Sequence, residues 1–227
     1  MSRKIPNLPQ PIIYLITSGA TTSQTTPDSD KFSEVLTIIE KAVEVETPLV
    51  QIREKALTAR VLYELTSRAA KLVRGTRTRL LVNDRFDLAL AAGADGVHLT
   101  GQSLPTSVVR ATCPDYFLIG VSTHSVFEAM RAQADGADFI LFGPVFETES
   151  KRAFGEPQGL SKLAEVAQAL PGFPVVAIGG IALANVDECF RNGAAGVAAI
   201  RLLNDAENLN SIVGEIHQRH ARVKKGD

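Results

Sequence analysis

Ala92-Gly93-Ala94-Asp95-Gly96-Val97 is a segment that recurs, with small changes, as Asp135-Gly136-Ala137-Asp138-Phe139-Ile140 and as Asn192-Gly193-Ala194-Ala195-Gly196-Val197. Each copy follows a stretch with helical spacing of apolar residues and leads into a short apolar run. Glycine supplies the left-handed backbone conformation that ends a helix before the chain turns into the next element. The repeated helix–glycine–strand junction predicts a chain built from strand–helix units.

Eight apolar, β-branched runs are the candidate strands of these units. They cover residues 12–16, 48–52, 79–83, 96–99, 117–121, 139–142, 174–178 and 196–200, with helical spacing between them, for example over 31–45 and 58–73. The runs are too apolar for a sheet with one wet face, which favours parallel strands covered by helices. Eight of them predict a single α/β domain, a closed (β/α)8 TIM barrel, in preference to an open doubly wound sheet.

Length and composition agree with one soluble domain. The 227 residues are 45% hydrophobic and carry a formal net charge of -1, so no bulk attraction to nucleic acid or to an anionic membrane is expected. No run of about 18 apolar residues occurs, and the first ten residues lack the apolar core of a targeting peptide. We expect a cytoplasmic protein whose partners are small molecules, with homo-oligomerisation left open.

The domain boundaries follow from the strand pattern. We expect an N-terminal extension over 1–10, the barrel domain over 11–220 and a basic C-terminal tail over 221–227. Cys113 and Cys189 lack metal or redox spacing and are expected to be buried thiols, whereas His217 and His220 are expected at the surface.

The segment Gln51-Ile52-Arg53-Glu54-Lys55 marks the candidate site, because it ends an apolar run with alternating polar residues. A period of two sends Gln51, Arg53 and Lys55 to one side of the strand. In a TIM barrel the active site lies at the carboxyl ends of the strands. An amide and two cations there would attract phosphate or pyrophosphate.

The ends of the other predicted strands supply further polar groups at the same face. In chain order these are Asn83 and Asp84, His98, Ser122 and His124, the loop through Lys151, Gly179-Gly180, and Ile200-Arg201. Taken alone, Asp84 could equally cap a helix and His98 could be a core histidine. The polar loop over residues 18–30 could cover the site or simply face solvent.

Five motifs in order carry a resemblance to a known family. They are VQIREK at 50–55, LLVNDRFDLALAAGADGVHL at 80–99, GVSTHS at 120–125, FGPVFETESK at 142–151 and VVAIGGI at 175–181. As a set they resemble the thiamine phosphate synthase and thiazole tautomerase superfamily, over about residues 11 to 203, and the pyrophosphate-site residues are closer to the synthases.

For a synthase the resemblance implies coupling of 4-amino-2-methyl-5-hydroxymethylpyrimidine diphosphate to hydroxyethylthiazole phosphate, with release of pyrophosphate and help from Mg²⁺. Gln51 and Asn83 would hold the pyrimidine or its diphosphate, and Arg53 and Lys55 the pyrophosphate. Asp84 would bind Mg²⁺, and the second acidic metal ligand of the family falls on Ser103. The remaining implied residues are Thr148, Ser150 and Lys151 over the leaving group, and backbone N–H groups at Gly180 and Ile200 for the thiazole phosphate.

Ser122 and His124, after the fifth predicted strand, complete the catalytic candidates. In the tautomerase alternative, His124 would move a proton on a thiazole carboxylate phosphate, since imidazole titrates near neutral pH. A third alternative is a barrel that binds thiamine precursors without turnover, which the serine at position 103 would favour.

Overall fold

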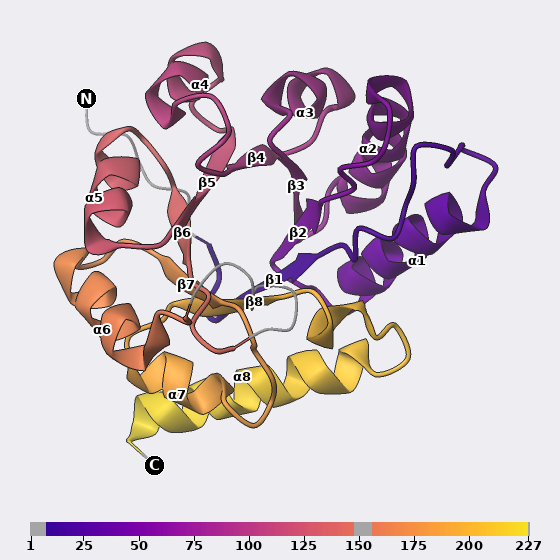
Figure 1. Ribbon diagram of the computed structural model, residues 1–227. Helices are drawn as coiled ribbons and strands as arrows, with labels where there is room; N and C mark the ends of the chain where they lie inside the picture. The colour runs from indigo at the N-terminus through magenta and orange to yellow at the C-terminus, as the bar shows by residue number, and fades with distance from the viewer. Residues whose placement is uncertain (1–7, 148–155, 227) are drawn as a thin grey trace.

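The computed structural model describes residues 8–147 and 156–226, and eight parallel strands form a closed barrel in it (Figure 1). The strands follow chain order around the ring, and the last one pairs with the first, so the predicted (β/α)8 barrel is confirmed. Their bounds are β1 Ile12–Ile16, β2 Leu49–Ile52, β3 Arg79–Asn83, β4 Gly96–Leu99, β5 Leu118–Thr123, β6 Phe139–Phe142, β7 Val175–Ile178 and β8 Gly196–Ala199.

The helices surround this ring in Figure 1 and cover the outer face of the sheet. Their bounds are α1 Asp30–Glu44, α2 Ala59–Val73, α3 Phe86–Ala92, α4 Thr106–Thr112, α5 Val126–Ala134, α6 Gly159–Ala169, α7 Val186–Arg191 and α8 Leu209–Lys225, with a 3₁₀ turn η2 at Leu202–Asn204. Predicted and observed strand bounds differ by two residues at most.

Alternating strand residues divide the core into two clusters. One side of each strand packs against the helices, and the other fills the barrel interior, where Ile12, Tyr14, Leu81, Phe139 and Leu141 meet. Burial on both faces explains why the strands appear as continuous apolar runs in the sequence.

An aromatic group occupies the middle of the barrel. The ring of Tyr14 lies 5.6 Å from that of Phe139 and 5.9 Å from that of His98, centroid to centroid. Gly120 makes this packing possible, because a Cβ there would lie 2.4 Å from Cζ of Phe139 and 2.8 Å from Nδ1 of His98. The interior is therefore filled by side chains up to the level of His98.

The recurring helix–glycine–strand segment has a structural role that involves its aspartate as well as its glycine. Gly93, Gly136 and Gly193 all adopt positive φ, at 77°, 95° and 87°. In the first two copies the aspartate that follows accepts a backbone N–H from the start of the preceding strand: Asp95 Oδ2 from Leu80 at 2.9 Å, and Asp138 Oδ2 from Ile119 at 2.7 Å. The repeat thus fixes the register between neighbouring strands at the amino end of the barrel.

The C-terminal part of the chain differs from the prediction in two ways. Helix α8 continues to Lys225, so most of the expected basic tail is its last turn, where cations favourably face the negative end of the helix dipole. His220 is not at the surface: it is buried and its ring lies 4.9 Å from that of Phe190. The expected N-terminal extension falls mostly outside the described residues, although Leu8 packs against the barrel interior.

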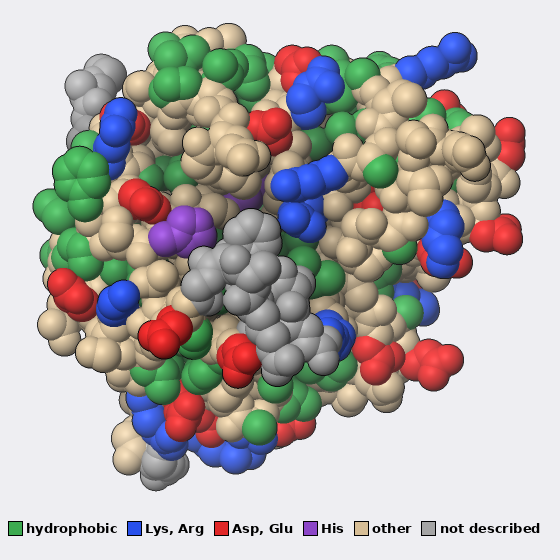
Figure 2. Space-filling view, in the orientation of Figure 1, with side chains coloured by type: hydrophobic (Ala, Val, Ile, Leu, Met, Phe, Trp, Pro, Cys, Tyr) green, Lys and Arg blue, Asp and Glu red, His purple; other side chains and the backbone are tan. Residues whose placement is uncertain are grey.

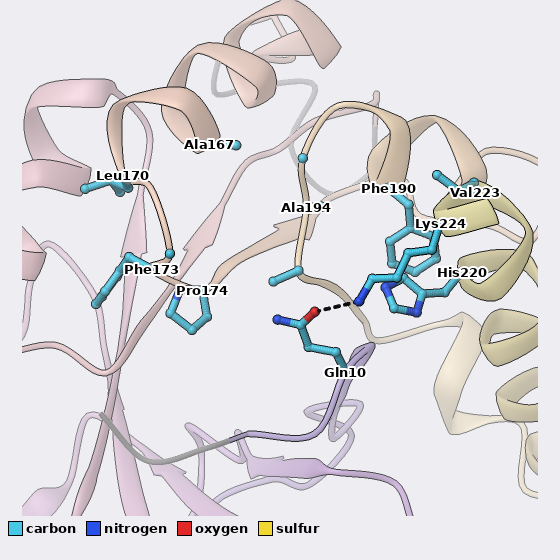
Figure 3. A pocket seen from close by; sticks show the side chains of 13 residues that line it. Gln10, Ala167, Leu170, Phe173, Pro174, Phe190, Ala194, His220, Val223 and Lys224 are labelled. Carbon is cyan, nitrogen blue, oxygen red and sulfur yellow. Dashed lines mark hydrogen bonds between the residues drawn. The ribbon is translucent and has the colours of Figure 1, made fainter. Parts of the chain in front are cut away.

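A cavity of about 300 Å³ opens at the end of the barrel where the strands begin, its amino end (Figure 3). Its lining comes from residues that precede β1, β7 and β8, including Gln10, Pro174 and Ala194, and from His220 and Lys224 of α8. Lys224 Nζ donates to Gln10 Oε1 at 3.3 Å. The cavity lies at the end opposite to the predicted site.

The buried ion pair of Asp138 with Arg110 predicts a large stability effect. Arg110 Nη2 lies 2.7 Å from Asp138 Oδ2, whose side chain is 1% exposed, and the guanidinium also donates to the carbonyls of Phe117 and Gly136. Asp138→Ala should lower the free energy of unfolding by about 3–5 kcal/mol, because it leaves the partly buried charge of Arg110 without its counter-ion and the Ile119 N–H without its acceptor. Urea denaturation measures this loss.

Asp135→Ala is the matched control. Its carboxylate lies 3.6 Å from a largely exposed Arg131, so the loss should stay below about 1 kcal/mol. Equal losses in the two variants would contradict the role assigned to Asp138.

Candidate active site

Polar side chains replace apolar ones where the inner strand positions reach the carboxyl end of the barrel. β2 supplies Gln51, which is 1% exposed and whose Nε2 donates to Oδ1 of Asn83 at the end of β3, at 3.1 Å. Among the described residues no donor reaches Gln51 Oε1, although that atom is buried. A buried acceptor without a partner is costly, so this amide is suited to a ligand that brings a donor.

Arg53 follows β2 on the same side as Gln51. Its backbone N–H donates to Thr17 Oγ1 at 2.9 Å, just beyond the end of β1, and its side chain is half-buried. Its positive charge also contributes to the lowered pKa of His98, after burial. Gln51 and Asn83 thus meet at the carboxyl end of β2 and β3, and Arg53 follows directly after β2 at the same end. Figure 2 shows Lys or Arg side chains and His side chains near the middle of this face.

His98 is a neutral core histidine. Its side chain is 2% exposed, and Nε2 lies 2.9 Å from Ser122 Oγ of β5. Burial, and secondly the charge of Arg53, lower its pKa from 6.5 to about 3. The ring therefore stays uncharged at neutral pH and orients the Ser122 hydroxyl at the mouth.

Asp84 has an unusual backbone conformation, with φ at 66° in the left-handed region. Its N–H donates to the carbonyl of His98 at 2.8 Å, which holds the turn after β3 in place. The helix N-cap is Arg85, so the alternative that Asp84 caps α3 is wrong. A strained residue with an exposed carboxylate beside the mouth suggests a functional use, since such strain persists where function requires it.

The metal prediction rests on few ligands. Ser103 Oγ accepts the backbone N–H of Thr100 at 2.8 Å, so its hydroxyl closes a local turn. Across residues 8–147 and 156–226, no group of three or more His, Cys, Asp or Glu side chains forms a metal cluster. The described residues offer Asp84 as a single hard carboxylate rather than a complete cage.

His124 lies just outside β5 and is exposed. Its Nδ1 is hydrogen-bonded to the carbonyl of Gly143 after β6, and its backbone N–H donates to Glu128 of α5. A carbonyl oxygen can only accept, so Nδ1 carries a proton in this hydrogen bond. The neighbouring Ser125 caps α5, so His124 precedes the helix.

The turns after β7 and β8 present backbone donors. Gly179 and Gly180 have positive φ, and a Cβ on Gly180 would lie 2.7 Å from the carbonyl of Glu147, so these turns pack closely on the segment after β6. In the described part of the chain, no acceptor takes the N–H of Gly180 or of Ile200. Free N–H groups of this kind suit an anion.

Glu54 is a functional candidate that the sequence reasoning missed. The alternation that directs Gln51 and Arg53 into the mouth directs Glu54 to the opposite side, where it is 2% exposed. Its carboxylate accepts from Gly19 and Thr21 in the β1–α1 loop, rather than pairing with the neighbouring cations. A buried carboxylate with partners more than 30 positions away has no local sequence signal.

The remaining predicted site residues are Lys55 and three residues of the loop after β6. Lys55 is exposed in the turn before α2, three residues beyond the end of β2. Thr148, Ser150 and Lys151 lie outside the described residues.

Fold and site together define a class: a TIM barrel whose strand ends form a mouth for a phosphorylated ligand. The chain belongs to the thiamine monophosphate synthase family, whose model matches residues 15–203.

Individual relatives agree with the family. The putative thiamine-phosphate synthase of Geobacter sulfurreducens is 48% identical over 74% of this chain and 78% of the relative. The putative thiamine-phosphate synthase 2 of Aquifex aeolicus is 42% identical over 77% of this chain and 93% of the relative. The solved thiamine phosphate pyrophosphorylase from Pyrococcus furiosus superposes with a TM-score of 0.77 at 29% identity, covering 94% of this chain and 98% of that one.

The lowered pKa of His98 predicts a pH dependence of stability. The unfolded chain takes up a proton near pH 6.5 and the folded chain only near pH 3, so the stability contributed by neutral His98 is lost as the pH falls through this window. His98→Gln removes this titration. Its unfolding free energy should fall less steeply towards acid, by up to about 1.4 kcal/mol per pH unit. Urea denaturation at a series of pH values measures both slopes, and parallel profiles would contradict the assignment.

Proposed function

We propose that this chain joins 4-amino-2-methyl-5-hydroxymethylpyrimidine diphosphate to hydroxyethylthiazole phosphate and releases pyrophosphate. The observation that carries the proposal is the buried Gln51–Asn83 pair, whose free Oε1 lies at the mouth together with Arg53. An aminopyrimidine brings the donor that this acceptor lacks, and a diphosphate brings the negative charge that the guanidinium attracts. The family and its relatives support the same reaction.

The charge change of the reaction explains the residue types. The bond between the methylene carbon and the diphosphate oxygen breaks, the carbon joins the thiazole, and negative charge collects on the departing diphosphate. A fixed cation aimed at those oxygens stabilises the transition state more than the bound substrate. Arg53 takes this part at the mouth, and we propose that Lys55 and Lys151 add to it. Thr148 and Ser150 are proposed to contact the same leaving group.

Mg²⁺ fits the site as a shared ligand rather than as a resident ion in a cage. Magnesium is commonly bound through one or two carboxylates, with substrate phosphates and water completing the shell. Asp84 would hold it in this way, since its exposed carboxylate is the hard donor beside the mouth. The bound ion would neutralise charge on the leaving group. Ser103 stays a prediction, and the Thr100 N–H already occupies its hydroxyl.

The second substrate is proposed to bind on the opposite side of the mouth. The N–H groups of Gly180 and Ile200 would donate to the oxygens of the thiazole phosphate, and Ser122, hydrogen-bonded to His98, would lie between the two substrates. No group of the protein needs to act as a nucleophile, because the thiazole attacks directly.

Other predictions about the protein's setting remain. In the part of the chain that the structure describes, no helix is both long and apolar enough to cross a bilayer. A cytoplasmic location and the lack of a nucleic-acid partner stay predictions of the sequence, and homo-oligomerisation stays open.

The decisive assay mixes purified protein with both substrates and Mg²⁺ and follows pyrophosphate release together with formation of thiamine phosphate. Release that requires both substrates is expected. Tight binding of both without turnover would support the binding-only barrel. Isomerisation of a thiazole carboxylate phosphate that is lost in His124→Ala, and does not need Mg²⁺, would support the tautomerase.

Asp84→Ala should change the metal requirement of the reaction. The Mg²⁺ concentration for half-maximal release should rise by at least about 10- to 100-fold, the cost of losing even an indirect partner of a metal. A magnesium titration at saturating substrates measures the shift.

Asp87→Ala is its matched control. Asp87 is an exposed carboxylate in the first turn of α3, paired with Arg85 through Oδ2 at 2.6 Å, and its removal should leave the titration unchanged. A titration that is the same in wild type and Asp84→Ala would remove Asp84 from the metal site.

A further inference from the structure

The β1–α1 loop is held at the barrel mouth by one buried carboxylate. Glu54 Oε1 accepts the N–H of Gly19 at 3.0 Å, and Oε2 accepts the N–H and the hydroxyl of Thr21 at 3.2 Å and 2.7 Å. Burial of a charged group is costly unless donors surround it, and three donors from a single loop do so here. Loop and carboxylate therefore stabilise one another.

The same loop contacts Arg53. A Cβ on Gly19 would lie 3.5 Å from the carbonyl oxygen of Arg53 and 4.0 Å from its Nη1, so the loop backbone passes directly beside the guanidinium. Gly19 has φ at 74°, which allows this close approach. At the start of this loop, Thr17 accepts the Arg53 N–H at 2.9 Å and donates its own N–H to the Gln51 carbonyl at 3.0 Å.

These contacts surround Arg53 on two sides. Thr17 fixes its backbone, and the loop segment that Glu54 fixes limits the space open to its side chain. The loop itself is packed against the barrel, since two of its own side chains, Thr21 and Thr25, are buried.

We propose that Glu54 is a positioning residue for the proposed synthase reaction: by fixing Gly19 and Thr21 it holds the β1–α1 loop against Arg53 and keeps the guanidinium directed at the diphosphate. Glu54 itself touches neither substrate, because it points away from the mouth. The steady-state kinetic test of this proposal rests on the proposed function. The measurements of pyrophosphate binding and of amide hydrogen exchange do not.

Glu54→Gln tests it with a side chain of the same shape. The amide keeps one acceptor oxygen and turns the other into a donor, which then faces an N–H or a hydroxyl of the loop. The dissociation constant for inorganic pyrophosphate with Mg²⁺, measured by calorimetry, should rise about tenfold, because a guanidinium no longer held in place loses roughly one charged hydrogen bond to the ligand. In steady-state assays, kcat/KM for the pyrimidine diphosphate should fall by a similar factor, with KM for the thiazole phosphate unchanged.

A double-variant cycle separates positioning from general destabilisation. If Glu54 acts through Arg53, Glu54→Gln should add almost nothing to the loss of pyrophosphate affinity in an Arg53→Ala background. Glu46→Gln is the control, because that exposed carboxylate pairs with Arg77 at 3.0 Å, away from the loop, and should leave affinity unchanged.

Two further measurements keep the test independent of folding and of activity. Amide hydrogen exchange at Gly19 and Thr21 should be slow in the wild type and faster in Glu54→Gln. Thr21→Val removes the hydroxyl donor and should weaken pyrophosphate binding, whereas Thr21→Ser keeps it and should not.

The proposal is overturned if folded Glu54→Gln binds pyrophosphate as the wild type does, if it impairs both substrates equally, or if its effect persists undiminished without Arg53. An inactive wild type would instead refute the proposed function, while the exchange and pyrophosphate measurements would still decide the role of Glu54.

Discussion

Closure of the sheet is the constraint on which the site depends. β8 pairs with β1 in parallel, with Ile13 opposite Val197, so strands from the two ends of the chain become neighbours. Asn204 reinforces the closure at the rim, where its Nδ2 donates to the carbonyl of Ile16 at 2.7 Å. Because every strand runs in the same direction, closure collects eight carboxyl ends into one mouth. Residues that are far apart in the sequence can then act on a single ligand.

Polar groups at the two ends of the barrel have different effects on stability. At the amino end, Asp95 and Asp138 each accept a strand N–H, and Arg110 neutralises the second of them. At the mouth, Gln51 keeps a buried oxygen without a partner and Asp84 keeps a left-handed backbone. Such features lower stability in the free protein. The hydrogen-bonded carboxylates at the amino end stabilise the barrel, whereas the features at the mouth that ligand binding uses cost stability.

The sequence allowed the barrel to be predicted because its signals are local. Period-two alternation, apolar runs and the glycine junctions depend on neighbouring residues, and they placed the strands to within two residues and put Gln51 in β2. The contacts of Glu54 could not be predicted from the sequence, since its partners Thr21 and Gly19 lie 33 and 35 positions before it and no sequence pattern connects them. His220 was misjudged for a similar reason: its helix is amphipathic, but the ring that buries it belongs to α7. The left-handed turn at Asp84 depends on the carbonyl of His98 in the next strand.

Gly120 and Phe139 share one volume in the barrel interior. A methyl group on the first would overlap the ring of the second, and the ring in turn packs on Tyr14. Descendants of this sequence can therefore enlarge position 120 only after position 139 has become smaller, because the reverse order forces the added methyl group into the ring of Phe139. The history of substitution at these two sites should consequently be ordered, with the aromatic side lost first wherever the glycine has been replaced.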